Sequence, residues 1–246
     1  MILVAVVIYI FGGKMLSFLR YKLKYSESNM YMLLEGRQAL IIDPNISDEA
    51  LSELRCSNVK EVYILLTHEH FDHTTGVNWY REKFDTTVVC QKDCAAKIID
   101  SKNNRPFVFF PMVEDRTEEE KREVLSFYDA LPTNPIRADV VFDDVFKFDW
   151  RKHNIFIKAC PGHSPGSAVV IVDNEYAFTG DYMIPDVPVI LRFPGGSKEL
   201  YNKRTLPYLL GLAENMLIMP GHGDPYLKIN SKYQNGIFKS GDENGK

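Results

Sequence analysis

Residues 67–73 read Thr-His-Glu-His-Phe-Asp-His, which places three histidines and one aspartate in a loop directly after a short apolar run. In an extended segment, residues two apart point the same way, so His68 and His70 can bind one ion together. Asp72 and His73 come where the chain turns into the next predicted helix, and they can reach a second ion. Folding alone requires no such concentration of histidine, which favours a metal site over a solvated polar loop.

Three more metal-binding side chains follow later apolar runs and sit among glycines. They are His163 in CPGHSPGS, Asp181 in FTGDY and His222 in MPGHGDP. Glycine has no side chain, so it lets the backbone approach a ligand closely or adopt a positive φ. Imidazole nitrogens and carboxylate oxygens are the ligands expected for zinc, iron or manganese, and neutral imidazole is available at physiological pH. These motifs therefore predict further metal ligands.

The motifs HEHFDH, GHSPGS, TGD and PGHG occur in this order between about Tyr25 and Pro225, and together they resemble the metallo-β-lactamase superfamily. The resemblance implies an α/β (α+β) fold, a four-layer αββα sandwich whose metals lie at one edge between two sheets. It also implies seven metal ligands. Those of the first ion are His68, His70 and His163, those of the second are Asp72, His73 and His222, and Asp181 would bridge the two.

Position 181 is aspartate rather than cysteine. By resemblance, the chain is therefore more similar to hydrolases of the glyoxalase, lactonase and phosphodiesterase type than to zinc β-lactamases with a cysteine ligand. The implied cofactors are two divalent ions, zinc first and manganese or iron as alternatives. A bridging water held as hydroxide then cleaves a small-molecule ester, thioester, lactone or phosphodiester. Asp72 is expected to orient this water and pass its proton to the leaving group. Tyr182, which follows Asp181, is expected to support the metal ligands, to line the substrate or simply to pack.

Within the superfamily, the segments GHSPGSAVVIV, FTGDYMI and FPGGS resemble the hydroxyacylglutathione hydrolase branch, whose members cleave thioesters. That enzyme usually has an extra C-terminal helical domain that binds glutathione, whereas only 24 residues follow His222 here. The lactonase branch usually places a tyrosine three residues after the bridging aspartate, and this chain has Ile184 there. Glutathione thioesters and homoserine lactones therefore both lose support as substrates.

Two other classes of function share some of these motifs. Persulfide dioxygenases use one iron, bound by fewer of the ligands, and the complete set of seven favours two metals over this alternative. Nucleases of the RNA-processing branch normally add a basic arm, which this sequence lacks. The formal net charge of -4 and the sequence pI of about 5.9 also disfavour a broad nucleic-acid surface. The expected partner is a small-molecule substrate, and the oligomeric state stays open.

The chain of 246 residues is predicted to form one domain, residues 1–246. Residues 1–13 are apolar but shorter than the roughly 20 residues needed to span a membrane, so they predict an edge strand or an extension and no transmembrane segment. Residues 101–142 predict a partly helical insertion, whose run RPFVFFPM either lines the active site or anchors the insertion. The polar residues 231–246 predict a loose tail. Four scattered cysteines predict reduced thiols in a cytoplasmic protein.

Strands and helices are predicted to alternate around the first motif. A helix is expected at Ser47–Arg55 with Ser47 as its N-cap, and another at Lys92–Ile99. Glu69 points away from its neighbouring histidines, so it is expected either at the surface or in support of the ligands. His153, in the sequence RKHN, is expected to be an exposed turn residue.

Overall fold

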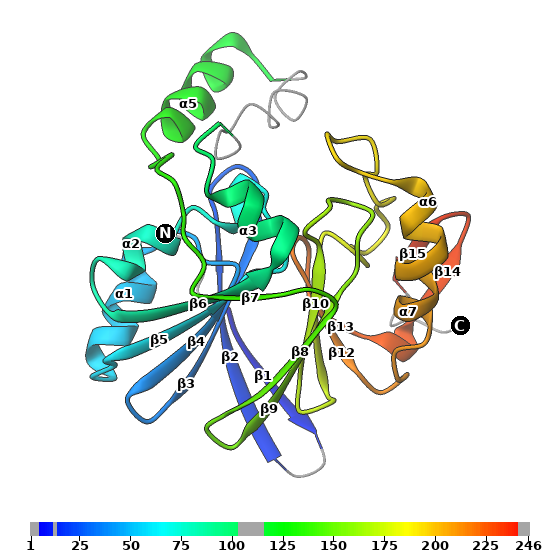
Figure 1. The fold of residues 1–246 in the computed structure, drawn as a ribbon, viewed down its shortest axis with the longest axis horizontal. Coiled ribbons are helices and arrows are strands. Elements are labelled where there is room, and N and C mark those ends of the chain that lie inside the picture. Colours follow the sequence, from blue (N-terminus) through cyan, green and yellow to red (C-terminus); the bar gives the residue numbers. More distant parts are fainter. Residues whose placement is uncertain (1–4, 12–13, 103–115, 241–246) are drawn as a thin grey trace.

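Two β-sheets form the centre of the protein (Figure 1), of which the computed structural model describes residues 5–11, 14–102 and 116–240. The strands of the first sheet are β1 (Ala5–Phe11), β2 (Lys14–Lys22), β3 (Asn29–Glu35), β4 (Gln38–Ile42), β5 (Glu61–Leu65), β6 (Asp85–Gln91) and β7 (Val140–Phe142). The strands of the second sheet are β8 (Val145–Trp150), β9 (His153–Ala159), β10 (Ala168–Val172), β11 (Tyr176–Gly180), β12 (Leu217–Pro220) and β13 (Tyr226–Leu227). In both sheets the strands pair in sequence order.

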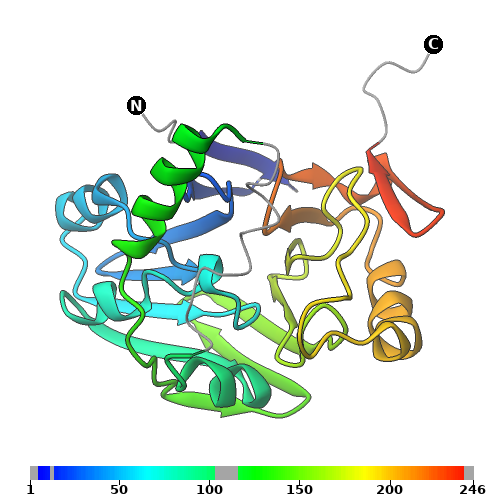
Figure 2. The ribbon, with the colours of Figure 1, turned by 90° about the horizontal axis from the view of Figure 1, so that it is seen from above.

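Helices cover the outer face of each sheet, which gives four layers (Figures 1 and 2). The helical segments on the first sheet are α1 (Asp48–Cys56), α2 (Val77–Arg81) and α3 (Lys92–Ile98). Those on the second sheet are α6 (Lys198–Leu200), the π-helical turn η3 (Tyr201–Thr205) and α7 (Leu206–Leu210). The predicted αββα sandwich is therefore confirmed. Within the described residues, no helix is long and apolar enough to cross a membrane.

The core between the sheets is built from strands that are apolar on the facing side. Strands β10, β11 and β12 are buried along their whole length, because one face meets the first sheet and the other meets helices. Phe18 and Tyr31 of the first sheet meet Phe178 of the second edge-on, with ring centroids 5.1 and 5.2 Å apart. These contacts hold the two sheets at a fixed distance and so fix the edge where their loops meet.

Parallel strands bring the predicted ligands to one edge of the sandwich. In the first sheet β4, β5, β6 and β7 run parallel, and in the second β11 runs parallel to β12. The carboxyl ends of parallel strands meet at the same edge, where α/β proteins usually place their sites. Residues 67–73 follow β5, Asp181 follows β11 and His222 lies two residues after β12.

The first helix begins as its sequence predicts. Ser47 has extended backbone angles, and its side chain accepts a hydrogen bond from the Ala50 backbone N–H, which confirms it as the N-cap of α1. A further helix, α5 (Glu118–Asp129), begins with a capping box in which Thr117 and Glu120 satisfy each other's backbone N–H groups. This helix lies above the first sheet (Figure 1), and the run RPFVFFPM before it lies outside the described residues.

Three sequence predictions differ from the structure. The predicted loose tail is wrong over residues 231–240, which form a hairpin of β14 (Ser231–Gln234) and β15 (Ile237–Ser240). Asn235 and Gly236 both have positive φ, as a two-residue hairpin turn requires, and Phe238 is buried against the second sheet. The predicted insertion of residues 101–142 ends too late, because β7 pairs with β6 as part of the first sheet.

His153 is buried rather than exposed. It opens β9, whose alternation turns His153 inward together with Ile155 and Ile157. Its Nδ1 lies 2.6 Å from Asp173 Oδ2, and its Nε2 lies 3.4 Å from Glu35 Oε1 on the first sheet. A histidine between two carboxylates therefore links the sheets at the end of β9 away from His163.

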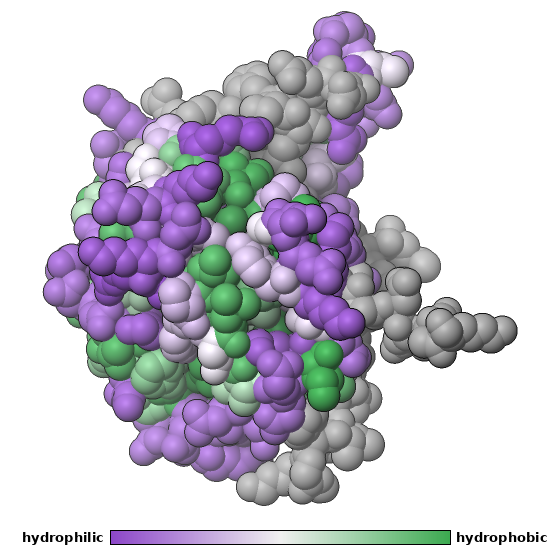
Figure 3. Space-filling view, turned by 90° about the vertical axis from the view of Figure 1, so that its right-hand side faces the viewer, coloured by the Kyte–Doolittle hydropathy of each residue, from purple (hydrophilic) through white to green (hydrophobic). Residues whose placement is uncertain are grey.

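The surface around α6 and α7 is mixed in character. Figure 3 shows this side of the molecule, with hydrophobic patches set among hydrophilic side chains. The exposed large apolar side chains of these helices are Leu200 and Leu210. Scattered apolar side chains are ordinary on soluble proteins.

The four cysteines are free thiols, three of them buried.

Candidate metal centre

The seven predicted ligand residues lie together at the edge of the two sheets. Two groups of side chains are close enough for each to hold an ion, with the ligand atoms of each group within 4.8 Å of one another. The first group comprises His68, His70, His163 and Asp181, and the second comprises Asp72, His73 and His222. Loops after β5, β9, β11 and β12 supply them, so the centre exists only when both sheets are in place.

Asp181 lies between the two groups and turns one carboxylate oxygen to each. Its Oδ2 is 3.2 Å from His163 Nε2 in the first group. Its Oδ1 is 3.2 Å from His73 Nε2 and 3.4 Å from His222 Nε2 in the second. This is the arrangement that a carboxylate bridging two cations requires.

Four of the five histidines have Nδ1 held by the protein. His163 Nδ1 donates to the Ile190 carbonyl at 2.8 Å, and His222 Nδ1 donates to the Ser26 carbonyl at 3.0 Å. His73 Nδ1 lies 2.9 Å from the Asp43 carboxylate. A ring that donates through Nδ1 keeps a lone pair on Nε2, and in each case Nε2 faces the centre of the site.

The tautomer of His68 follows from its neighbour. Thr67 Oγ1 donates its one hydrogen to Asp43 Oδ2 at 2.6 Å. His68 Nδ1, 3.0 Å from the same hydroxyl, must therefore be the donor in that contact, which leaves the lone pair on His68 Nε2.

Several buried atoms at the centre have no hydrogen-bond partner in the described structure. They are His68 Nε2, His73 Nε2 and Asp181 Oδ1. In addition, His163 Nε2 lies only 2.9 Å from His70 Nδ1, so a nitrogen with a free lone pair faces a second ring nitrogen. Burying unpaired polar atoms is costly unless a cation or a proton lies between them. The donor set therefore fits divalent metal ions.

Asp43, which follows β4, holds two of the predicted ligand segments in place. Its Oδ1 accepts the Thr67 backbone N–H at 2.7 Å, while its Oδ2 receives the Thr67 hydroxyl and His73 Nδ1. Asp43 also lies within metal-binding distance of His68 and His73. With three donors already on its two oxygens, it acts through those histidines. The signal for it in the sequence was an aspartate directly after the apolar run QALII, one strand before the histidine loop.

Burial and charge set the protonation of the site. Burial lowers the pKa of His68 well below its usual range and lowers that of His70 to about 3. Burial also acts to lower the pKa of His73, but the carboxylates of Asp72 and Asp181 outweigh it and hold that pKa well above its usual value. Burial acts to raise the pKa of Asp181, whereas the neighbouring histidines hold it well below its usual range. His68 and His70 are therefore neutral and Asp181 is ionised, which are the forms that bind a cation, whereas His73 has to lose a proton before its Nε2 can do so.

Close backbone packing keeps the second group compact. A Cβ atom on Gly221 would lie 2.8 Å from His73 Cε1 and 2.9 Å from Asp181 Oδ1. Only glycine therefore fits at this position, which agrees with the sequence expectation that glycines allow close approach around the ligands.

Tyr182 supports the loop that carries His163. Its hydroxyl accepts the His163 backbone N–H at 2.8 Å and donates to the Cys160 carbonyl at 2.7 Å. Its ring is buried and stacks on Tyr201, with centroids 5.8 Å apart. These contacts favour the first of the three roles expected for Tyr182, support of the ligands.

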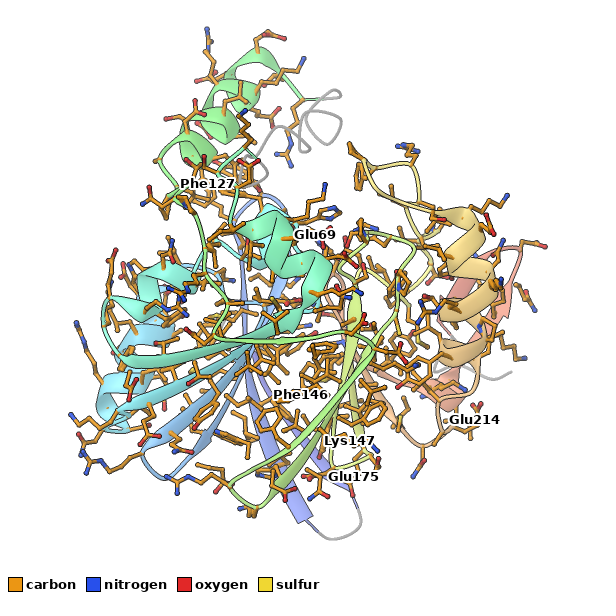
Figure 4. All side chains as sticks on the ribbon, viewed as in Figure 1. Glu69, Phe127, Phe146, Lys147, Glu175 and Glu214 are labelled. Carbon is orange, nitrogen blue, oxygen red and sulfur yellow. The ribbon has the colours of Figure 1, made fainter. Side chains whose placement is uncertain are left out.

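Aromatic side chains lie next to the ligands on two sides. Phe193 approaches the His70 and His163 rings edge-on, at 5.5 and 5.9 Å between centroids. On the other side, Tyr128 of α5 packs near Phe71, the residue before Asp72, at 6.4 Å. Figure 4 labels Phe127, also on α5, above the first sheet. The sequence did not predict Phe193, because nothing in the run LRFPGGS shows that it folds back over the histidines.

Comparison with known proteins supports the motif analysis. The family model described as the metallo-beta-lactamase superfamily matches residues 25–222. A protein of Bacillus subtilis (strain 168) named "Probable metallo-hydrolase YqgX" is 25% identical over 199 residues, 80% of this chain and 85% of that protein. The "Hydroxyacylglutathione hydrolase GloC" of Haemophilus influenzae is 27% identical over 207 residues, 83% of this chain and 88% of that protein.

A solved structure gives the same fold. The crystal structure of the BLEG-1 B3 metallo-beta-lactamase superposes with a TM-score of 0.65 at 24% sequence identity. The match covers 85% of this chain and 93% of that one. At this level of identity the likeness concerns the architecture rather than the substrate.

Proposed function

This chain belongs to the metallo-β-lactamase superfamily, and from that premise we propose that it is a hydrolase that uses two divalent metal ions to cleave a small-molecule thioester. The observation that carries the proposal is the position of Asp181, which turns one oxygen to each group of histidines. Two ions sharing one carboxylate would lie side by side, as hydrolysis at a dinuclear centre requires.

The proposed ligands divide between two ions. His68, His70 and His163 would hold the first, Asp72, His73 and His222 the second, and Asp181 would bridge them. When bound, such ions lower the pKa of a water molecule and polarise the oxygen of the bond to be cleaved. Zinc suits the imidazole and carboxylate donors, and the same donors accept manganese or iron.

The direction of its carboxylate supports the proposal that Asp72 handles the proton. Its Oδ2 lies 3.4 Å from His222 Nε2 and 3.6 Å from His73 Nε2, which directs that oxygen into the second group. The other oxygen, Oδ1, would then accept a proton from the attacking water and pass it to the leaving group. Burial acts to raise the pKa of Asp72, but His73 and His222 outweigh it and lower that pKa, so the carboxylate starts in the basic form.

The thioester assignment rests on relatives and on the walls of the site. GloC is named a hydroxyacylglutathione hydrolase, and a hydroxyacylglutathione is a thioester. Phe193 lies over the first group and offers an apolar surface for an acyl chain or a thiol carrier. A thiolate is a better leaving group than an alkoxide, so the proton from Asp72 is needed less at that step.

The test combines elemental analysis with a substrate panel. The purified protein is expected to carry about two zinc or manganese ions per chain and to hydrolyse thioesters faster than lactones, aryl esters or phosphodiesters. Removal of the metals with a chelator should abolish turnover, and adding zinc back should restore it. One iron per chain with oxygen uptake and no hydrolysis would contradict the proposal and favour the mononuclear dioxygenase chemistry instead.

A further inference from the structure

Glu69 lies between two histidine ligands in the sequence but points away from the metal centre. The residue is only 6% exposed, and in Figure 4 it lies beside α3 at the top of the first sheet. Because alternate residues of an extended segment point to opposite sides, His68 and His70 face the centre while Glu69 faces the loop that carries His163. Nothing in the roles proposed above uses this buried carboxyl group.

The carboxyl group of Glu69 ends a short chain of hydrogen bonds. Ser164 Oγ, in the residue after His163, donates to Glu69 Oε2 at 2.8 Å. Having given its one hydrogen to Glu69, the Ser164 hydroxyl must accept from Ser167 Oγ, 2.8 Å away. The Ser164 backbone N–H in turn donates to Ser167 Oγ at 3.1 Å. Glu69 is therefore the final acceptor of this chain.

The loop of residues 160–167 packs directly onto Glu69. A Cβ atom on Gly166 would lie 2.5 Å from Glu69 Oε2 and 2.3 Å from the backbone nitrogen of Cys94 in α3. The base of the loop is closed by the bond from the Cys160 N–H to the Ser167 carbonyl at 2.7 Å. Glu69 thus holds the tip of a loop whose base is already fixed.

The position of the loop tip sets the distances between side chains of the first group. His163 Nε2 lies 2.9 Å from His70 Nδ1, so a small shift of the loop would change the distance between two proposed ligands of one ion. Glu69 is covalently next to His68 and His70, and it is hydrogen-bonded to the residue next to His163. It joins these two segments at the tip of the loop, while the bond from the Ala168 N–H to the Thr67 carbonyl at 2.7 Å joins them at its base.

The second group rests on a different set of contacts. Ser26 supplies the carbonyl that holds His222, and Ser28 Oγ donates to the Asp72 carbonyl at 3.0 Å. Both serines belong to the turn between β2 and β3, and neither is part of the chain that ends at Glu69. The contacts that hold the first group are therefore separate from those that hold the second. The exceptions are Asp181, which faces both groups, and Asp43, which contacts both Thr67 and His73.

From these contacts, and given the two-metal function proposed above, we propose that Glu69 is a positioning residue for the first metal. It docks the His163 loop against the His68–His70 segment and so sets the affinity of that site without touching the ion. Changes to Glu69 should weaken one metal site and leave the other unchanged.

The experiment titrates the metal-free protein with cobalt(II) and follows its visible spectrum in competition with a chelator. The Glu69→Ala variant should lose affinity for one of two cobalt equivalents by about 10–100-fold, as expected when a group that orients a metal ligand is removed. Its spectrum should match that of the His163→Ala variant rather than that of His222→Ala. The Glu69→Gln variant, whose amide oxygen can still accept from Ser164, should restore the affinity.

Two further variants separate positioning from general destabilisation. Ser164→Ala removes the donor to Glu69 and should weaken the same equivalent, even if Glu69→Ala fails to fold. Ser28→Ala, the matched control, should leave the affinity for cobalt at the first group unchanged. Equal weakening of both equivalents in Glu69→Ala, or a Glu69→Gln variant as weak as Glu69→Ala, would overturn the inference. A wild-type chain that binds no cobalt would overturn the proposed function itself. If every Glu69 variant binds two cobalt ions with wild-type affinity, only the role of Glu69 is overturned.

Discussion

His73 and Asp43 are joined by a buried contact of 2.9 Å between Nδ1 and Oδ2. It links the end of β4 to the short helical turn η1 (Phe71–His73), which follows β5. The same carboxylate holds the backbone and hydroxyl of Thr67, so one side chain fixes both ends of the histidine loop. The bond at Nδ1 thereby orients the His73 ring so that Nε2 faces the proposed second metal.

Replacing Asp43 by asparagine should weaken metal binding at the second group by about 10–100-fold, because the amide group cannot accept all three donors. Leaving buried donors unpaired should also lower the free energy of unfolding by about 1–3 kcal/mol. Metal titration and urea unfolding measure the two effects. Asp149→Asn, at an exposed position of β8, is the control and should change neither.

Replacing Asp72 by asparagine should lower kcat by about 10²–10⁴-fold, since the variant cannot take a proton from the attacking water. Metal content has to be measured on the same sample, because Asp72 also faces the second group. A variant that kept both its metals and its full turnover would show that Asp72 does not handle the proton.

Replacing Tyr182 by phenylalanine should destabilise the chain by about 1–3 kcal/mol, because the His163 N–H and the Cys160 carbonyl lose their buried partner. Metal affinity at the first group should fall as well, since the His163 loop loses one anchor. Tyr226→Phe is a matched control, as it removes a tyrosine hydroxyl that donates to the Met183 carbonyl and does not bond the His163 loop. Equal metal affinity in both variants would argue that Tyr182 only packs.

The link between the sheets at Glu35 predicts a pH dependence of stability. Burial acts to raise the pKa of Glu35, but Lys152 and His153 outweigh it and lower that pKa below its usual value. A lowered folded-state pKa contributes stability above the unfolded-state value, and this contribution is lost as pH falls through the folded-state pKa. Wild type should therefore be more stable than Glu35→Gln at neutral pH, with the difference vanishing in acid.

Chemical unfolding at a series of pH values checks this prediction, with Glu123→Gln on the exposed face of α5 as the reference. A difference between wild type and Glu35→Gln that did not change with pH would mean that Glu35 contributes through packing alone.

Local pattern in the sequence predicted individual elements, and a family resemblance implied their arrangement. The apolar run before THEHFDH became β5 and Ser47 capped α1, while the sandwich was implied by the superfamily that the four motifs resemble. The strand and the cap depend on neighbours close in the chain, through the period of a strand and the bond from a cap to a helix N–H. The hairpin of residues 231–240 was predictable in the same way, from Asn235-Gly236 between alternating residues, but the polar composition of the tail concealed it.

Tertiary structure decided everything that depends on which strands lie side by side. The inward position of His153 follows from the partner sheet, because the sequence RKHN looks like a turn until β9 is paired and its alternation is set. Asp43 follows an apolar run and Glu69 lies inside the histidine motif, but neither position by itself reveals its partners. Asp43 meets Thr67 and His73 because β4 lies beside β5, and Glu69 meets Ser164 because the His163 loop packs against α3. The sequence thus specified which residues could bind metal, while the packing of two sheets determined which atoms face one another and which side chains hold them there.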